Sequence, residues 1–300
     1  MNDREGHSKS LGGSWLGLRA QFAVPRIWWG PLWAAWCGAV ATGVLDWDGA
    51  HLLRVVLVLV LADPLVANLC HLVFDAEWPA TGAEKAVEAQ DVPVLPYTVG
   101  ASPGHRLGQW LNRTAGWWKS SFWPQAGWLV SSVALEVVGL LTLGAVLGQP
   151  VMRVVILGLG GMGLALLTRT RAAEFSLALR AVIETGLVWL IGYMAFAPLA
   201  LPALLLAGLY AVAYWAGLRA LTKGLKASAV GVAGALVGMA VLLIIIEHPV
   251  SGALVGLLGV FPIGLSLAWR GQILTDRYVR SIQFYMLAAT LLSALSVKML

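Results

Sequence analysis

Three polar residues at the end of an apolar run have the types and the spacing of a membrane-embedded site. Asn68, His71 and Asp75 fall at positions i, i+3 and i+7, so a helix would carry all three on one face. Polar side chains are costly in hydrocarbon and usually face a protein interior or a wet cavity. This face therefore predicts a binding or catalytic site. The alternative is a helix end whose polar side chains simply reach the lipid headgroups.

The composition is that of an integral membrane protein. Hydrophobic residues make up 59% of the chain and charged residues only 12%, whereas soluble domains average about 25% charged residues. The net charge of +5 is interpreted as a topology signal, and no nucleic-acid partner is expected. Cys37 and Cys70 both lie in apolar runs and predict neither a metal site nor a disulfide framework.

Nine apolar segments predict an all-α membrane domain of nine transmembrane helices over residues 27–300, since each crossing takes about 20 helical residues. The predicted spans are 27–45, 51–72, 127–148, 151–168, 177–197, 200–220, 227–246, 250–268 and 281–297. Residues 1–26 have no signal-peptide character and form a polar leader, whose amphipathic part at 15–22 suits a cytoplasmic membrane surface.

The distribution of basic residues predicts the orientation of these spans. The N-terminal segment and every second loop, with the adjoining helix ends, hold 17 of the 20 Lys and Arg residues. The other side holds only Arg54, Arg153 and Lys298. Cytoplasmic loops carry the excess of Lys and Arg, so we expect the N-terminus in the cytoplasm and the C-terminus outside, in an inner or plasma membrane.

One connection, residues 73–126, is much longer than the others. Loops of this length are usually functional or disordered. Its segment 83–90 has the composition of a short helix, and its aromatic-basic stretch 110–123 suits an anchor at the membrane interface. We expect these two segments to form a cap over the cytoplasmic mouth of the bundle.

The helix count, orientation and polar helix ends resemble the UbiA superfamily of intramembrane prenyltransferases. Members have nine transmembrane helices and two aspartate-rich motifs at the cytoplasmic ends of helices two and six. The first motif reads roughly Asn-Asp-x-x-Asp-x-x-x-Asp. Here Asp75 matches its middle acid, with His71 at its first position and Pro79 at its last. The second motif would lie in 214–224, which contains no acid. The resemblance covers about residues 22–297 and implies a UbiA-like bundle.

The resemblance also implies a ligand and a metal. The ligand would be a polyprenyl diphosphate bound through Mg²⁺, which withdraws charge from the leaving diphosphate. Asp75 and His71 would be catalytic. Asn68, Asp75 and Glu77 would be the metal ligands, because Mg²⁺ prefers oxygen donors. If the chain has no transferase activity, no cofactor is expected.

Positive charge stands where the family has its second acidic motif. Basic side chains bind diphosphate directly, arginine with two parallel hydrogen bonds. Arg219, Lys223 and Arg171 are therefore the predicted diphosphate-binding residues. The alternative is that these cations only reflect the excess of basic residues on the cytoplasmic side.

Further acids lie within the predicted spans. Asp63 precedes Pro64, which frees a backbone carbonyl and favours a kink, and Glu136 has no partner within one turn of its own helix. Both are candidates to bridge helices or to line a polar route. Glu184 follows Arg180 by four residues and is interpreted as an ordinary helix pair.

Three functions remain open on the sequence alone. The first is a prenyltransferase that handles a polyprenyl lipid. The second is a non-catalytic relative that binds an isoprenoid lipid, a quinone or a pigment, or that serves as a subunit of a larger membrane complex. The third is a transporter, because Asp63-Pro64 and Pro198 could mark the broken helices that many transporters contain.

Overall fold

The computed structural model describes residues 30–43, 48–76, 78, 102–168, 173–223, 225–268 and 275–297, and within these ranges all regular structure is helical. The helical elements are α1 (Pro31–Ala41), α2 (Gly49–Val60), η1 (Leu61–Ala67), α3 (Asn68–Phe74), α4 (Pro103–Trp117), η2 (Trp118–Phe122), α5 (Trp123–Leu147), α6 (Gln149–Thr168), α7 (Ala173–Ala181), η3 (Val182–Leu187), α8 (Val188–Met194), α9 (Leu201–Lys223), α10 (Leu225–Ile245), α11 (Pro249–Ala268) and α12 (Thr275–Val297).

Six helices of the described residues are long and apolar enough to cross a membrane, so the chain is an integral membrane protein by helix length and composition. They are Gly49–Phe74, Trp123–Leu147, Gln149–Thr168, Glu174–Met194, Leu201–Leu221 and Tyr278–Val297. The three other predicted spans fall on shorter apolar helices, Pro31–Ala41, Ala229–Ile245 and Pro249–Leu265. That all nine cross the membrane stays a prediction, as does their orientation.

Three helices contain a π-helical turn, where the backbone is wider than in an α-helix. η1 joins α2 to α3 and contains Pro64, so the disruption predicted at this proline is taken up without ending the helix. η2 joins α4 to α5. η3 joins α7 to α8 and carries Glu184 in its first turn. Single π turns inside α-helices often occur at functional sites.

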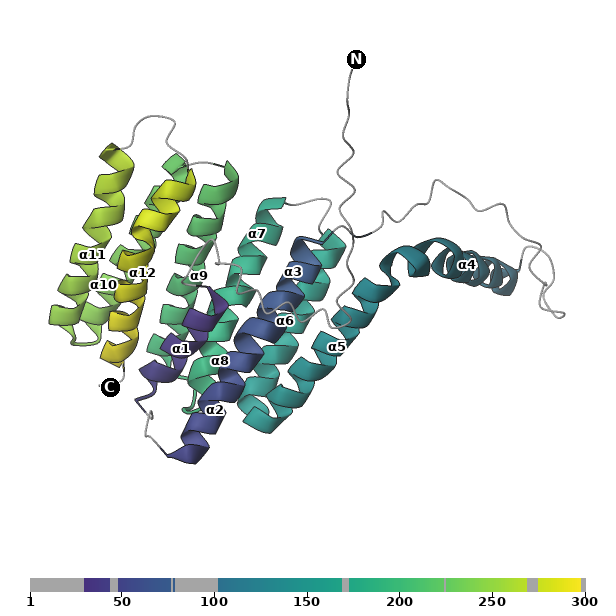
Figure 1. Cartoon of the computed structure of the whole chain (residues 1–300), viewed down its shortest axis with the longest axis horizontal. Helices are drawn as coiled ribbons and strands as arrows, with labels where there is room; N and C mark the ends of the chain where they lie inside the picture. The colour runs from purple at the N-terminus through teal and green to yellow at the C-terminus, as the bar shows by residue number, and fades with distance from the viewer. Residues whose placement is uncertain are drawn as a thin grey trace, which may run out of the picture.

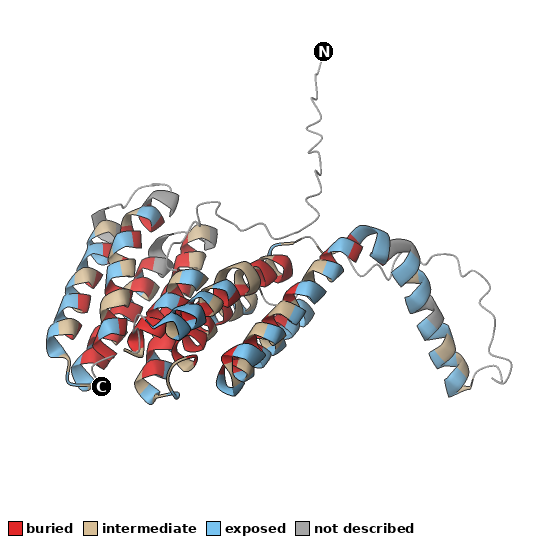
Figure 2. Ribbon diagram, turned by 60° about the horizontal axis from the view of Figure 1, so that its bottom comes forward, coloured by how far each residue is buried: buried red, intermediate tan, exposed pale blue. Residues whose placement is uncertain are grey.

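The helices stand side by side, with α9 to α12 toward one end of the row and α3, α5 and α6 toward the other (Figure 1). The α1 helix packs on α8 and also contacts α12, so it connects the two groups. Buried residues face neighbouring helices and exposed residues face outward (Figure 2). Many exposed residues are large and apolar, such as Leu135, Leu157 and Ile245. Soluble monomers rarely expose so much apolar surface, whereas helices in lipid require it.

The contact between α1 and α8 depends on two glycines. A Cβ atom added at Gly38 would overlap the backbone carbonyl of Trp189, and one added at Gly192 would overlap that of Ala35. Small residues let membrane helices approach closely, and van der Waals packing then stabilises the pair. Close approach of α1 and α8 therefore requires glycine at both positions.

A buried polar cluster links α1, α9 and α12. The indole nitrogen of Trp33 donates to Thr290 Oγ1 at 2.9 Å, and the Tyr210 hydroxyl donates to the carbonyl of Thr290. Ser293 Oγ donates to the same carbonyl at 2.8 Å. Hydrogen bonds between membrane helices satisfy polar groups that lipid cannot satisfy. This cluster therefore fixes the relative position of three helices.

Candidate functional site

Asp75 lies just after α3, where it connects two helices. Its Oδ2 accepts a hydrogen bond from His71 Nδ1 at 2.9 Å, and its Oδ1 accepts one from Arg180 Nη1 of α7 at 2.7 Å. The Arg180 guanidinium also lies over the ring of Phe74, 5.9 Å from its centroid. The two predicted catalytic residues, His71 and Asp75, are thus together, and both side chains are more than a third exposed. They form the accessible end of the site.

The polar contacts continue from Arg180 into the bundle. Arg180 Nε donates to Glu184 Oε1 at 2.8 Å, and the Tyr214 hydroxyl of α9 donates to Glu184 Oε2 at 2.7 Å. Glu184 is only 3% exposed. A carboxylate at this depth needs both a cation and hydrogen bonds to offset its lost hydration. We call His71, Asp75, Arg180, Glu184 and Tyr214 the polar network; it joins α3, α7, η3 and α9.

The charge state of Asp75 follows from these neighbours. Partial burial acts to raise the pKa of its carboxyl, but the Arg180 guanidinium and the hydrogen bond from His71 outweigh that effect. The net result is a pKa below the ordinary aspartate value of about 3.9. Asp75 is therefore ionised at neutral pH and forms a true ion pair with Arg180.

Replacing Asp75 by asparagine should give a pH-dependent loss of stability. A carboxyl whose pKa is lowered on folding stabilises the protein above its unfolded pKa, and that contribution is lost as the pH falls through the folded pKa. At pH 7 we expect Asp75→Asn to be less stable than wild type by no more than about 1 kcal/mol, since the pair is partly exposed. Melting temperatures in detergent between pH 7 and pH 3 test this. A difference that stays constant below about pH 4 would contradict the ion pair.

Asn68 belongs to a different contact. Its Nδ2 donates to Glu136 Oε1 of α5 at 2.6 Å, in the buried interior. Glu136, which has no partner on its own helix, thus obtains one from a neighbouring helix. The predicted polar face of Asn68, His71 and Asp75 therefore divides into two contacts at different depths. Asp63, the other acid singled out from the sequence, lies partly buried within η1.

Of the predicted diphosphate-binding residues, Arg219 lies beside α7, the helix whose Arg180 pairs with Asp75. The Arg219 guanidinium lies over the Trp215 ring, 5.2 Å from its centroid, and its Nε is 3.9 Å from Glu174 Oε1 of α7. Lys223 is the last residue of α9, but its side chain lies outside the described residues. Arg171 and Glu77 also lie outside them. Of the predicted cations, the structure thus places one side chain, that of Arg219.

The described donors do not fit a magnesium site. Within the described residues, no group of three or more His, Cys, Asp or Glu side chains could hold a metal ion. Both oxygens of Asp75 already accept hydrogen bonds, one of them from a guanidinium, and a cation there would compete with Arg180 for the same carboxylate. Mg²⁺ is normally held by carboxylates together with substrate phosphates. The described donors therefore support no reaction step that depends on Mg²⁺.

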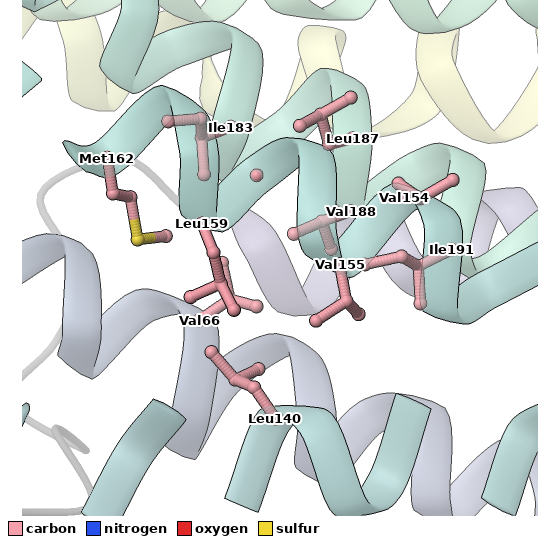
Figure 3. Close-up of a pocket in the computed structure, with 11 residues that line it drawn as sticks. Val66, Leu140, Val154, Val155, Leu159, Met162, Ile183, Leu187, Val188 and Ile191 are labelled. Atoms are coloured by element: carbon pink, nitrogen blue, oxygen red, sulfur yellow. The ribbon is translucent and has the colours of Figure 1, made fainter. Parts of the chain in front are cut away.

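A small apolar cavity lies between η1, α5, α6 and the η3–α8 helix (Figure 3). Its volume is about 20 Å³, enough for about one water molecule, and cavities with an apolar lining stay dry. Figure 3 shows only hydrocarbon side chains and the Met162 sulfur around it. This cavity is too small for a lipid tail.

A larger apolar groove of about 380 Å³ lies between the α7–η3–α8 helix and α9. We call it the α9 groove. It is open outward, since Val182, Leu204 and Val212 on its walls are each more than 40% exposed. Its lining is Ala178, Val182, Gly186, Leu187, Leu190, Leu204, Ala207, Gly208, Ala211, Val212 and Trp215. The groove thus ends at Trp215, whose ring makes a cation–π contact with the Arg219 guanidinium.

Sequence reasoning missed three members of the polar network. Arg180 and Glu184 were assigned to an ordinary pair on one helix, although an acid and a base inside a membrane span are a functional signal by themselves. That signal could have been used. Tyr214 offered none, because a lone tyrosine in an apolar helix does not reveal its partner. The α9 groove was also not predictable, since it depends on how two helices pack.

A comparison with known proteins finds one distant relative. Over 205 residues the chain is 29% identical to the bacteriochlorophyll synthase 34 kDa chain of Chloroflexus aurantiacus. The match covers 66% of this chain and 56% of the relative, so the chain spans little more than half of that relative's length. No protein-family model and no solved structure matches the chain. The chain is thus distantly related to a bacteriochlorophyll synthase chain.

Proposed function

We propose that this chain is a UbiA-like prenyltransferase that binds a polyprenyl lipid with an anionic head group. The tail would lie in the α9 groove and the head group at Arg219. The observation that carries this proposal is a long apolar groove that ends at a cation. A lipid with an apolar tail and a phosphate head group matches this arrangement, because the tail would fit the groove and the phosphate would pair with the guanidinium.

The relationship to a bacteriochlorophyll synthase chain, a UbiA-family prenyltransferase, supports the choice of a prenyl lipid over other amphiphiles. It also favours a pigment as the acceptor. The polar network and the groove use neighbouring faces of the same helices, since Tyr214 of the network and Trp215 of the groove are consecutive residues of α9. Arg219 would supply the positive charge that stabilises a departing diphosphate.

Filling the groove should weaken lipid binding without unfolding the protein. A Cβ at Gly208 meets nothing within 4 Å, so Gly208→Leu adds a side chain to the groove without a clash. Displacing about two methylene groups of the tail should weaken the binding of geranylgeranyl diphosphate about tenfold. The matched control is Gly163→Leu on α6, where a Cβ also meets nothing within 4 Å.

The measurement is labelling by a photoreactive geranylgeranyl diphosphate in detergent, followed by peptide mapping. We expect labelled peptides from η3, α8 and α9 in wild type and in Gly163→Leu. In Gly208→Leu the same labelling should need about a tenfold higher probe concentration, at an unchanged melting temperature. Labelling that maps to other helices, or that Gly208→Leu leaves intact, would reject the proposed tail site.

A second candidate is binding of an isoprenoid lipid or prenylated pigment without transfer. Two observations favour it: the segment 214–224 contains no acid, and the Asp75 carboxylate is paired with Arg180. Under this reading the lipid binds but no product forms with any acceptor, with or without Mg²⁺. Product formation that depends on Arg219 would exclude it.

A further inference from the structure

The α4 helix is a structural unit without a protein partner in the described chain. Figures 1 and 2 both show α4 leaving the bundle at η2 and lying apart from the other helices. The helix has its own start signals: Pro103 is its first residue, and the Ser102 side chain accepts a hydrogen bond from the His105 backbone. Isolated helices of about 15 residues are marginal in water, so α4 needs a surface to cover it.

One face of α4 is apolar and largely exposed. Leu107, Trp110 and Leu111 fall at i, i+3 and i+4, and each is more than half exposed. Trp118 and Trp123, on the turns that follow, are 40% and 47% exposed. Helices of this kind lie in the plane of a membrane interface, where tryptophan rings are favoured.

The charge of this segment is of one sign. Residues 102–123 contain Arg106, Arg113 and Lys119 and no acid. Arg106 and Lys119 are exposed, and on a helical wheel Arg106 falls next to Trp110, at one edge of the apolar face. Basic residues beside an apolar face are attracted to anionic lipids. A surface that matches α4 must therefore have an apolar layer to receive the leucine and tryptophan side chains. It must also carry negative charge at its boundary with water, where the basic side chains lie.

The chain connection already brings α4 to the membrane boundary. The helix continues through η2 directly into α5, a candidate membrane span. We propose that α4 lies on the bilayer surface, with Leu107, Trp110 and Leu111 inserted among the acyl chains and its arginines at anionic headgroups. A helix in this position also fixes the depth of α5, because η2 joins the two.

Two labelled positions of the full-length protein test this proposal. Leu111→Cys places a thiol on the apolar face, and Gln109→Cys places one on the opposite face. Cys37 and Cys70 are both buried, so the unmodified chain is the labelling control. Each variant is labelled with bimane and reconstituted into vesicles of phosphatidylcholine with phosphatidylglycerol, and quenching is measured with brominated lipid and with iodide.

We expect brominated lipid to quench the label at position 111 and iodide to quench the label at position 109. Replacing phosphatidylglycerol by neutral lipid, or combining Leu111→Cys with Arg106→Gln and Arg113→Gln, should lower the bromolipid quenching at 111 about twofold or more. Equal iodide quenching at both positions would overturn the proposal. So would a label at 111 that neither agent quenches, because a protein surface would then cover this face.

Discussion

Replacing Arg180 by glutamine should destabilise the folded protein by about 3 kcal/mol or more, because Glu184 would stay buried without its cation. Glu184 is 3% exposed and receives two hydrogen bonds, from Arg180 and from Tyr214. Of these two donors only Arg180 is positively charged, so its loss leaves the Glu184 carboxylate with a neutral tyrosine hydroxyl alone. The free energy of unfolding in mixed micelles, measured by titration with sodium dodecyl sulfate, tests this.

The double variant Arg180→Gln/Glu184→Gln separates the charge effect from side-chain packing. Two neutral amides can still hydrogen-bond, and no buried carboxylate is left without a cation. Asp75 also loses Arg180, but its side chain is 39% exposed and water can solvate it. We therefore expect the double variant to be clearly more stable than Arg180→Gln. Arg153, exposed on α6, provides the control Arg153→Gln, which should change stability by less than about 0.5 kcal/mol. If Arg180→Gln behaved like Arg153→Gln, the buried ion pair would be refuted.

Adding one methyl group at Gly38 should also cost about 3 kcal/mol. In Gly38→Ala the new Cβ would overlap the backbone carbonyl of Trp189 on α8. A backbone atom cannot swing aside as a side chain can, so α1 and α8 would have to separate. Because α1 connects the two helix groups, the loss should lower the melting temperature of the whole protein.

Gly234 of α10 provides the matched control, since a Cβ there meets nothing within 4 Å. Gly234→Ala should leave the melting temperature unchanged or raise it slightly, as alanine favours a helix more than glycine does. Gly192→Ala should act like Gly38→Ala, and the double variant should lose less than the sum, because one separation of the helices relieves both overlaps. A Gly38→Ala protein as stable as wild type would rule out this close contact.

Helix positions could be predicted from the sequence because hydropathy depends on local composition. The second and fourth predicted spans, 51–72 and 151–168, agree with helices Gly49–Phe74 and Gln149–Thr168 within a few residues. Within the predicted connection 73–126, residues 103–122 are helical and continue into α5, and segment 83–90 lies outside the described residues. The amphipathic pattern of α4 is visible in the sequence, but its distance from the bundle is a tertiary property.

The site could be predicted only where its contacts are local. His71 and Asp75 are four residues apart on one helix, and the structure brings them together. Asn68 has a suitable spacing too, but its partner Glu136 is 68 residues away. Tyr214 and the α9 groove likewise depend on the packing of helices distant in sequence. Spacing along a helix therefore identifies candidates, and tertiary packing decides which of them meet.

Equilibrium binding of geranylgeranyl diphosphate to the purified wild-type chain, with Mg²⁺ and with a chelator, tests the proposed function most directly. Geranylgeraniol, which has the same tail without the charge, is the control ligand. We expect saturable binding of one diphosphate per chain that persists in chelator, because Arg219 rather than a metal would hold the head group, and much weaker binding of the alcohol. Equal binding of both ligands, or binding that requires Mg²⁺, would contradict a head-group site built from arginine.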